Sequence, residues 1–141
     1  MLVMFLFRRS SAVGSSQVQA SRELYRKFWA ENSCEARGLR LLRGWLSPEQ
    51  CTQSDEKNYF DVIGCDSGKR YRIHYGTVMN VYEIDDAGRR KVCWCFVPIG
   101  QLVAGDIMLT QKIALETNEF SALALANRFQ PIEPVGPRTR F

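Results

Sequence analysis

The sequence predicts an α+β protein, in which a four-stranded antiparallel meander sheet packs on a C-terminal helix and is preceded by N-terminal helices. Between Tyr59 and Val97 the apolar residues recur with a period of two, and turn sequences interrupt them. After Gly105 they follow a helical spacing in a segment rich in Leu and Ala. The 141 residues, 45% hydrophobic and 24% charged, are typical of one globular domain.

The domain is expected over residues 21–131, between two tails. Residues 1–20 show no periodic apolar pattern and are expected to be disordered, and residues 132–141 are expected to be irregular. The opening MLVMFLFRR contains an apolar run of seven residues with no basic residue before it. It therefore predicts neither a secretory signal nor a membrane-spanning helix.

Three helices are expected before the sheet. A stripe of apolar side chains predicts that residues 21–32 form a helix with four side chains in the core: Leu24, Tyr25, Phe28 and Trp29. A second helix over residues 35–45 should direct three more inward: Leu39, Leu42 and Trp45. Ser47, Pro48 and Gln50 form a capping-box sequence, which starts a short helix that runs to about Asp55.

Four strands are expected over residues 59–64, 70–75, 78–84 and 91–97. Gly76 and Thr77 suit a two-residue hairpin turn, which sets Arg70 opposite Glu83 and predicts an ion pair between them. In this register one face is apolar and must be buried: Tyr71, Ile73, Tyr75, Val78, Tyr82, Ile84, Val92, Trp94 and Phe96, with Asn80 as the polar intruder. The opposite face then carries a mixed set: Arg70, Arg72, His74, Met79, Val81, Glu83, Cys93, Cys95 and Val97.

The C-terminal helix should cover the apolar face. Asp106 is placed to cap it, and its stripe comprises Leu109, Ile113, Phe120, Leu123 and Ala124. Thr117-Asn118-Glu119 is a capping-type sequence in the middle, so the segment is expected to bend or to form two helices.

Charge makes nucleic acid a second choice of ligand. Of the net charge of +4, residues 1–22 carry +3 and residues 128–141 carry +2, which leaves −1 for the chain between them. Binding to a phosphate backbone needs clustered Lys and Arg. Sheet-type RNA readers also expose aromatic side chains, whereas this register buries them.

The five cysteines, an odd number at uneven spacing, favour a reducing cytoplasmic compartment. Cys93 and Cys95 share a sheet face with His74, so a thiol or soft-metal site is a third interpretation. The paired spacing of zinc sites is absent from the sequence, and so are the motifs of activated serines and phosphate loops. We therefore predict no cofactor, no metal and no catalytic residue.

Several segments together resemble a small family of uncharacterised bacterial proteins: YFDVIG, YRIHYG, MNVYEID, CWCFVP, GD-IML-QKIALE and ALANRF. The resemblance covers about residues 44–129. It implies a self-contained module and carries no activity or site residue with it.

The sequence thus favours a non-catalytic binding or regulatory module of the bacterial cytosol that does not bind membranes. A protein partner is the first expectation and nucleic acid the alternative. The binding surface is expected on the polar sheet face, beside the apolar loop of residues 98–105. Its candidate residues are Arg70, Arg72, His74, Glu83 and Cys95.

Overall fold

The structure is a computed structural model that describes residues 2–131; for residues 2–15 it describes the backbone alone. The chain forms two compact units, Met1–Arg37 and Gly38–Phe141. The boundary between units therefore lies beyond residue 20, where we expected the domain to begin. The second expected tail, residues 132–141, lies outside the described residues.

The first unit is dominated by one long helix, α1 (Leu2–Asn32). The backbone of residues 2–20 is helical, where a disordered tail was expected; this stretch contains no proline and a single glycine, Gly14, so no residue in it breaks a helix. The four side chains expected in the core are 56–70% exposed, so that prediction is wrong: Leu24, Tyr25, Phe28 and Trp29. Their aromatic rings contact one another at Trp29 instead.

Two short helices precede the sheet. In α2 (Cys34–Trp45) Leu42 is buried as expected, whereas Trp45 is exposed. Helix α3 (Pro48–Lys57) begins with the predicted capping box: the Gln50 amide donates to Ser47 Oγ at 3.2 Å, and the Ser47 amide donates to Gln50 Oε1 at 3.0 Å. These reciprocal bonds satisfy backbone donors at the helix start.

The sheet is an antiparallel meander of five strands in sequence order: β1 (Tyr59–Ile63), β2 (Arg70–His74), β3 (Val81–Ile84), β4 (Arg90–Cys95) and β5 (Asn127–Phe129). The first four strands confirm the expected meander. Strand β5 was expected to be helix, but Ala126 is extended and the following residues pair with the open edge of β4. An unpaired edge offers backbone donors and acceptors for such an added strand.

The register of β2 and β3 differs by one residue from the prediction. Ile73 pairs with Val81, and Tyr71 pairs with Glu83. The hairpin loop spans residues 75–80 instead of two residues, with Met79 at a φ of 53°. A slip of one residue moves every side chain of a strand to the other face. Tyr82 and Ile84 therefore leave the core face, while Val81 and Glu83 join it.

The expected ion pair between Arg70 and Glu83 is consequently absent. Arg70 lies opposite Ile84. Glu83 instead pairs with Lys69, with 3.3 Å between Nζ and Oε1.

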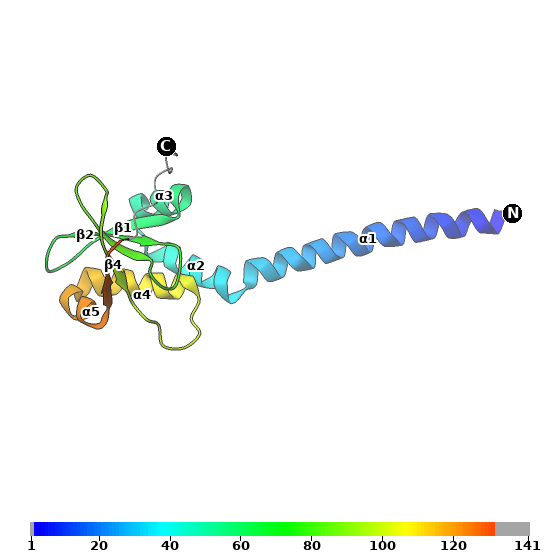
Figure 1. The fold of residues 1–141 in the computed structure, drawn as a ribbon. Coiled ribbons are helices and arrows are strands. Elements are labelled where there is room, and N and C mark those ends of the chain that lie inside the picture. The colour runs from blue at the N-terminus through cyan, green and yellow to red at the C-terminus, as the bar shows by residue number, and fades with distance from the viewer. Residues whose placement is uncertain (1, 132–141) are drawn as a thin grey trace, which may run out of the picture. The chain divides into compact units, whose positions relative to one another are not determined.

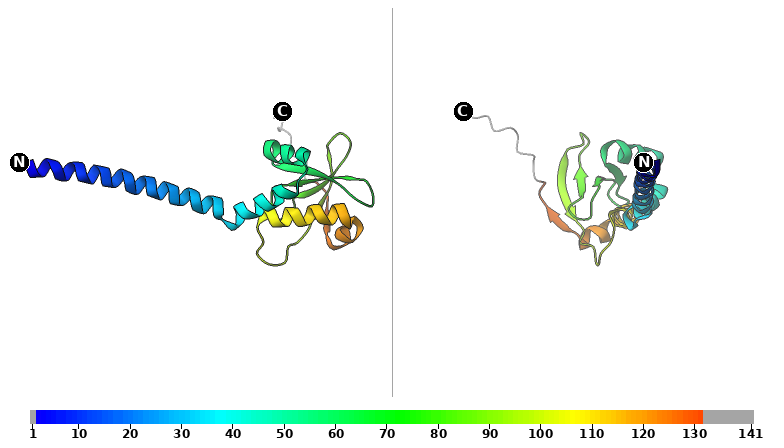
Figure 2. Two further views of the ribbon diagram at one scale, coloured as in Figure 1. Left: turned by 180° about the vertical axis from the view of Figure 1, so that it is seen from behind. Right: turned by 90° about the vertical axis from the view of Figure 1, so that its right-hand side faces the viewer.

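The core lies between the sheet and two helices, α2 and α4 (Ala104–Thr117). In both views of unit 2, α4 runs along one side of the sheet (Figures 1 and 2). The buried cluster consists of Leu42, Phe60, Val62, Tyr71, Ile73, Val81, Ala104, Met108, Leu109 and Leu115. Trp94 and Phe96 pack against it as expected, whereas the predicted helix residues Ile113 and Phe120 are exposed.

Helix α4 starts earlier than expected and is followed by a separate helix, α5 (Glu119–Leu125). Val103, which makes no side-chain cap, precedes α4, so the prediction that Asp106 caps the helix is wrong. The expected interruption is confirmed at Asn118, where the backbone leaves the helical region. In the described part of the chain no helix is long and apolar enough to cross a membrane.

Candidate functional site

The sheet has a second face, which points away from the core cluster. Register and ring contacts place these side chains on it: Tyr59, Asp61, Ile63, Arg70, Arg72, His74, Tyr82, Ile84, Arg90, Cys93, Cys95, Asn127 and Phe129. We call this set the second face. It contains most of the polar residues that sequence analysis singled out, in a different arrangement.

Three aromatic rings form a continuous series across β1, β2 and β3. The His74 ring centroid lies 5.3 Å from that of Tyr59 and 5.4 Å from that of Tyr82. The His74 and Tyr82 rings meet edge to face, with an interplanar angle of 86°. Such contacts hold the rings in fixed positions on the sheet.

Cationic side chains lie over the two tyrosines at the ends of this series. The Arg72 guanidinium lies 4.0 Å from the Tyr59 ring centroid, and that of Arg90 lies 4.2 Å from the Tyr82 ring centroid. Lys57 lies 5.9 Å from the Tyr59 ring. An aromatic face attracts a cation, so each ring helps to hold a positive charge at this surface.

Asp61 is the single acidic residue on the strands of the second face, and its charge is neutralised by an arginine of the same face, Arg72. Arg72 Nε donates to Asp61 Oδ1 at 2.8 Å, and Arg72 Nη2 donates to Oδ2 at 3.1 Å. Gln53 of α3 donates to the same carboxylate at 3.2 Å. This bidentate pair anchors Arg72 to β1 and neutralises the acid.

His74 is kept neutral by its surroundings. Burial and the nearby charges of Arg90 and Arg72 lower the pKa of His74 below its ordinary value of 6.5. Its Nε2 is buried and, among the described residues, has no hydrogen-bond partner. Near neutral pH this ring therefore acts as an uncharged aromatic surface.

Cys93 and Cys95 are on the second face but are buried. Burial raises the pKa of the Cys93 thiol. A thiol, in contrast to a thiolate, is a poor nucleophile and a poor metal ligand. The expected row of His74, Met79 and Cys95 is not formed, because Met79 lies in the 75–80 loop outside the strands.

Of the five predicted site residues, four lie on the second face: Arg70, Arg72, His74 and Cys95. Glu83 does not, because the register slip turns it toward the core side opposite Tyr71. Among the residues of the second face that sequence reasoning did not predict to be in the site are Tyr59, Tyr82, Arg90 and Phe129. The predicted register buried Tyr82, and the unexpected strand β5 brings Phe129 to the face.

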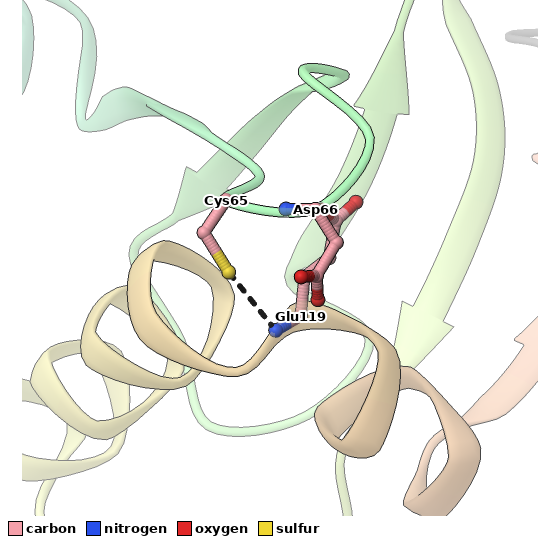
Figure 3. Close-up of side chains that lie close together, drawn as sticks. All are labelled: Cys65, Asp66 and Glu119. Carbon is pink, nitrogen blue, oxygen red and sulfur yellow. Dashed lines mark hydrogen bonds between the residues drawn. The ribbon is translucent and has the colours of Figure 1, made fainter.

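A second polar cluster joins the loop after β1 to the start of α5 (Figure 3). Cys65, Asp66 and Glu119 are the one group of three potential metal ligands that lie close together in the described chain. Glu119 is fully buried, and each of its carboxylate oxygens already accepts two hydrogen bonds. The donors are the Ser67 hydroxyl, the Tyr71 hydroxyl, and the backbone amides of Asp66 and Ser67.

Because all four hydrogen bonds to Glu119 come from the protein itself, the cluster connects the loop after β1 and strand β2 to α5. Burial raises the pKa of Glu119, but the four hydrogen bonds outweigh it and lower the pKa below its usual value. The Glu119 carboxylate is therefore charged and saturated with donors. A metal ion would have to displace hydrogen bonds that hold the loop in place.

Fold and site together define a small α+β domain with an antiparallel meander, one face of which packs on helices while the other presents arginines and aromatic rings. The chain matches no model of a known protein family, no curated protein and no solved structure.

Proposed function

We propose that the protein is a non-catalytic binding module of the bacterial cytosol and that its second face holds a polyanionic partner. One observation carries this proposal. Three cations border or occupy that face without a salt bridge to any described residue: Lys57, Arg70 and Arg90. The single acid on its strands, Asp61, is neutralised by Arg72.

The net charge of −1 between the basic ends of the chain is a sum over all residues there, and it does not give the local charge of the second face. Elsewhere in the second unit, four acids are paired with bases: Asp55 with Arg43, Glu83 with Lys69, Asp85 with Arg89, and Glu116 with Lys112. These pairs lie off the second face or at its turns. The described acids without such a pair lie on helices or in turns, outside the strands: Glu49, Glu56, Asp66, Asp86, Asp106 and Glu119. Lys57, Arg70 and Arg90 are thus a local positive cluster beside the aromatic rings, and a cluster of this kind attracts anions.

The state of the cysteines supports a non-catalytic role. A cysteine–histidine mechanism needs a thiol with a lowered pKa next to its base. Here burial raises the pKa of Cys93, and Tyr82 rather than His74 is its cross-strand neighbour. The cytosolic compartment is supported by the odd cysteine count and by the resemblance to bacterial proteins.

Retention on immobilised heparin, a polyanion without bases, tests the proposal. We expect the double variant Arg70→Glu/Arg90→Glu to elute at clearly lower salt than the wild type, because four units of charge change on the second face. Arg128→Glu/Lys91→Glu is the control with the same change in charge. Arg128 lies opposite Trp94, on the other side of β5, and Lys91 has no partner on β3, because the register shifts at this point. Equal loss of retention in both double variants would show that net charge, not this face, binds heparin.

A further inference from the structure

We infer that the polyanion is single-stranded nucleic acid, whose bases stack on the aromatic and guanidinium surfaces of the second face. The inference rests on the proposed function, since it names the ligand class of the same surface. Polyanion binding needs only the cations. The aromatic rings are the additional observation that points to bases.

Register places one row of side chains across all five strands: Asp61, Arg72, Tyr82, Cys93 and Phe129. Strands are about 4.8 Å apart, so the row extends about 19 Å across the sheet. Tyr82 and Phe129 stand in this row on either side of Cys93, which is 1% exposed. Phe129 on one side of Cys93, and on the other side the Arg90 guanidinium that lies over Tyr82, can contact successive bases.

Phe129 is the clearest indication of a ligand among these side chains. It is 45% exposed on an edge strand, and it belongs to the second face rather than to the core cluster. On a surface with nearby cations, it is suited to stack against a base, as aromatic residues do in proteins that bind single strands.

Arg90 combines both interactions. Its guanidinium carbon lies 4.2 Å from the Tyr82 ring centroid, and the residue is exposed. A guanidinium plane can stack on a base while its charge attracts a phosphate. In a duplex the base faces are covered by their neighbours, so only a single strand can use these surfaces.

Fluorescence anisotropy with labelled oligonucleotides tests the inference. The probes are a thymidine oligonucleotide of about 12 nucleotides, the same backbone without bases, and a duplex of that length. We expect the full chain to bind the thymidine strand about tenfold more tightly than the abasic strand, which is a typical contribution of base stacking. The duplex should bind no more tightly than the abasic strand, because both offer phosphates alone.

Two variants on adjacent residues locate the effect. Phe129→Ala should weaken binding of the thymidine strand about fivefold or more and leave the abasic strand unchanged. Arg128→Ala, one residue earlier and on the opposite side of β5, should preserve the preference for bases. Circular dichroism checks that both variants fold. If Phe129→Ala does not fold, Arg90→Ala provides the second test of base stacking.

The outcomes separate the inference from the proposed function. If heparin is retained but the thymidine and abasic strands bind equally, base stacking is refuted while polyanion binding stands. If neither heparin nor any oligonucleotide binds, both are refuted. A base preference that survives both Phe129→Ala and Arg90→Ala would overturn the placement of the bases on this face.

Discussion

Tyr71, in the centre of β2, donates its hydroxyl hydrogen to the Glu119 carboxylate at 2.6 Å, and both side chains are fully buried. The bond connects the middle of the sheet to the first residue of α5. The same carboxylate accepts the backbone amides of Asp66 and Ser67, and so it also holds the turn between β1 and β2. One buried anion thus joins three separate segments of the chain.

We predict that Glu119→Gln lowers the free energy of unfolding by about 3 kcal/mol, because the amide group cannot accept from all four donors and leaves buried groups unsatisfied. Urea unfolding followed by circular dichroism measures it. Glu56→Gln is the matched control, since Glu56 is exposed on α3, and it should stay within about 0.5 kcal/mol of the wild type. Similar midpoints for the two variants would contradict the structural role of Glu119.

Glu119 should also make stability depend on pH in the acidic range. Its pKa is lowered in the folded protein, whereas an unfolded glutamate titrates near pH 4.3 as a rough value. Below that value the unfolded chain binds the proton more readily, so stability is complete above about pH 5 and is lost as the pH falls through the folded pKa. The stability difference between wild type and Glu119→Gln should therefore shrink below about pH 4. A difference that stays constant from neutral to acid pH would refute this assignment.

Gly105 and Gly44 should respond oppositely to alanine. A Cβ at Gly105 would overlap the backbone carbonyl group of Gly38, where α4 crosses α2. We expect Gly105→Ala to cost about 3 kcal/mol, because backbone cannot move aside as a side-chain end can. At Gly44, inside α2, nothing lies within 4 Å, and Gly44→Ala should stabilise by about 0.5–1 kcal/mol. Thermal melts of the two variants should shift in opposite directions.

Asn80 and Gln111 form a reciprocal pair that connects the hairpin loop to α4. Asn80 Nδ2 donates to Gln111 Oε1 at 2.8 Å, and Gln111 Nε2 donates to Asn80 Oδ1 at 3.0 Å. Either alanine substitution leaves a buried amide unsatisfied and should cost about 2 kcal/mol. The double variant should cost clearly less than the two single changes together, which a double-mutant cycle of urea unfolding measures. Additive costs would show that the two amides act independently.

Arg72 and Arg90 share the second face but should differ in their effect on folding. Arg72→Glu sets a second carboxylate beside Asp61 in a largely buried position and should destabilise by about 3 kcal/mol. Arg90 is exposed and forms no salt bridge with a described residue, so Arg90→Glu should stay within about 0.5–1 kcal/mol of the wild type. Denaturant midpoints compare them. If both variants melt like the wild type, Arg72 does not anchor the sheet.

Local sequence signals determine the elements of this protein. The capping box at Ser47 starts α3, the capping-type sequence around Asn118 separates α4 from α5, and the period of two marks four strands. Each of these depends on residues within one or two turns of the chain, so each can be recognised without knowing what packs against it. The meander follows from the short connections between strands.

Only the tertiary structure decides which side chains share a face. Asn80 bonds to Gln111, 31 residues away in the sequence, and its side-chain amide also donates to the His74 carbonyl oxygen at 3.1 Å. With Asn80 held in this way, the hairpin has a long loop, and the register of β3 differs by one residue from the predicted one. That slip takes Tyr82 from the core to the second face, and the pairing of β5 with β4 adds Phe129. Both events depend on partners distant in sequence, and because side chains alternate along a strand, a shift of one residue exchanges core and surface.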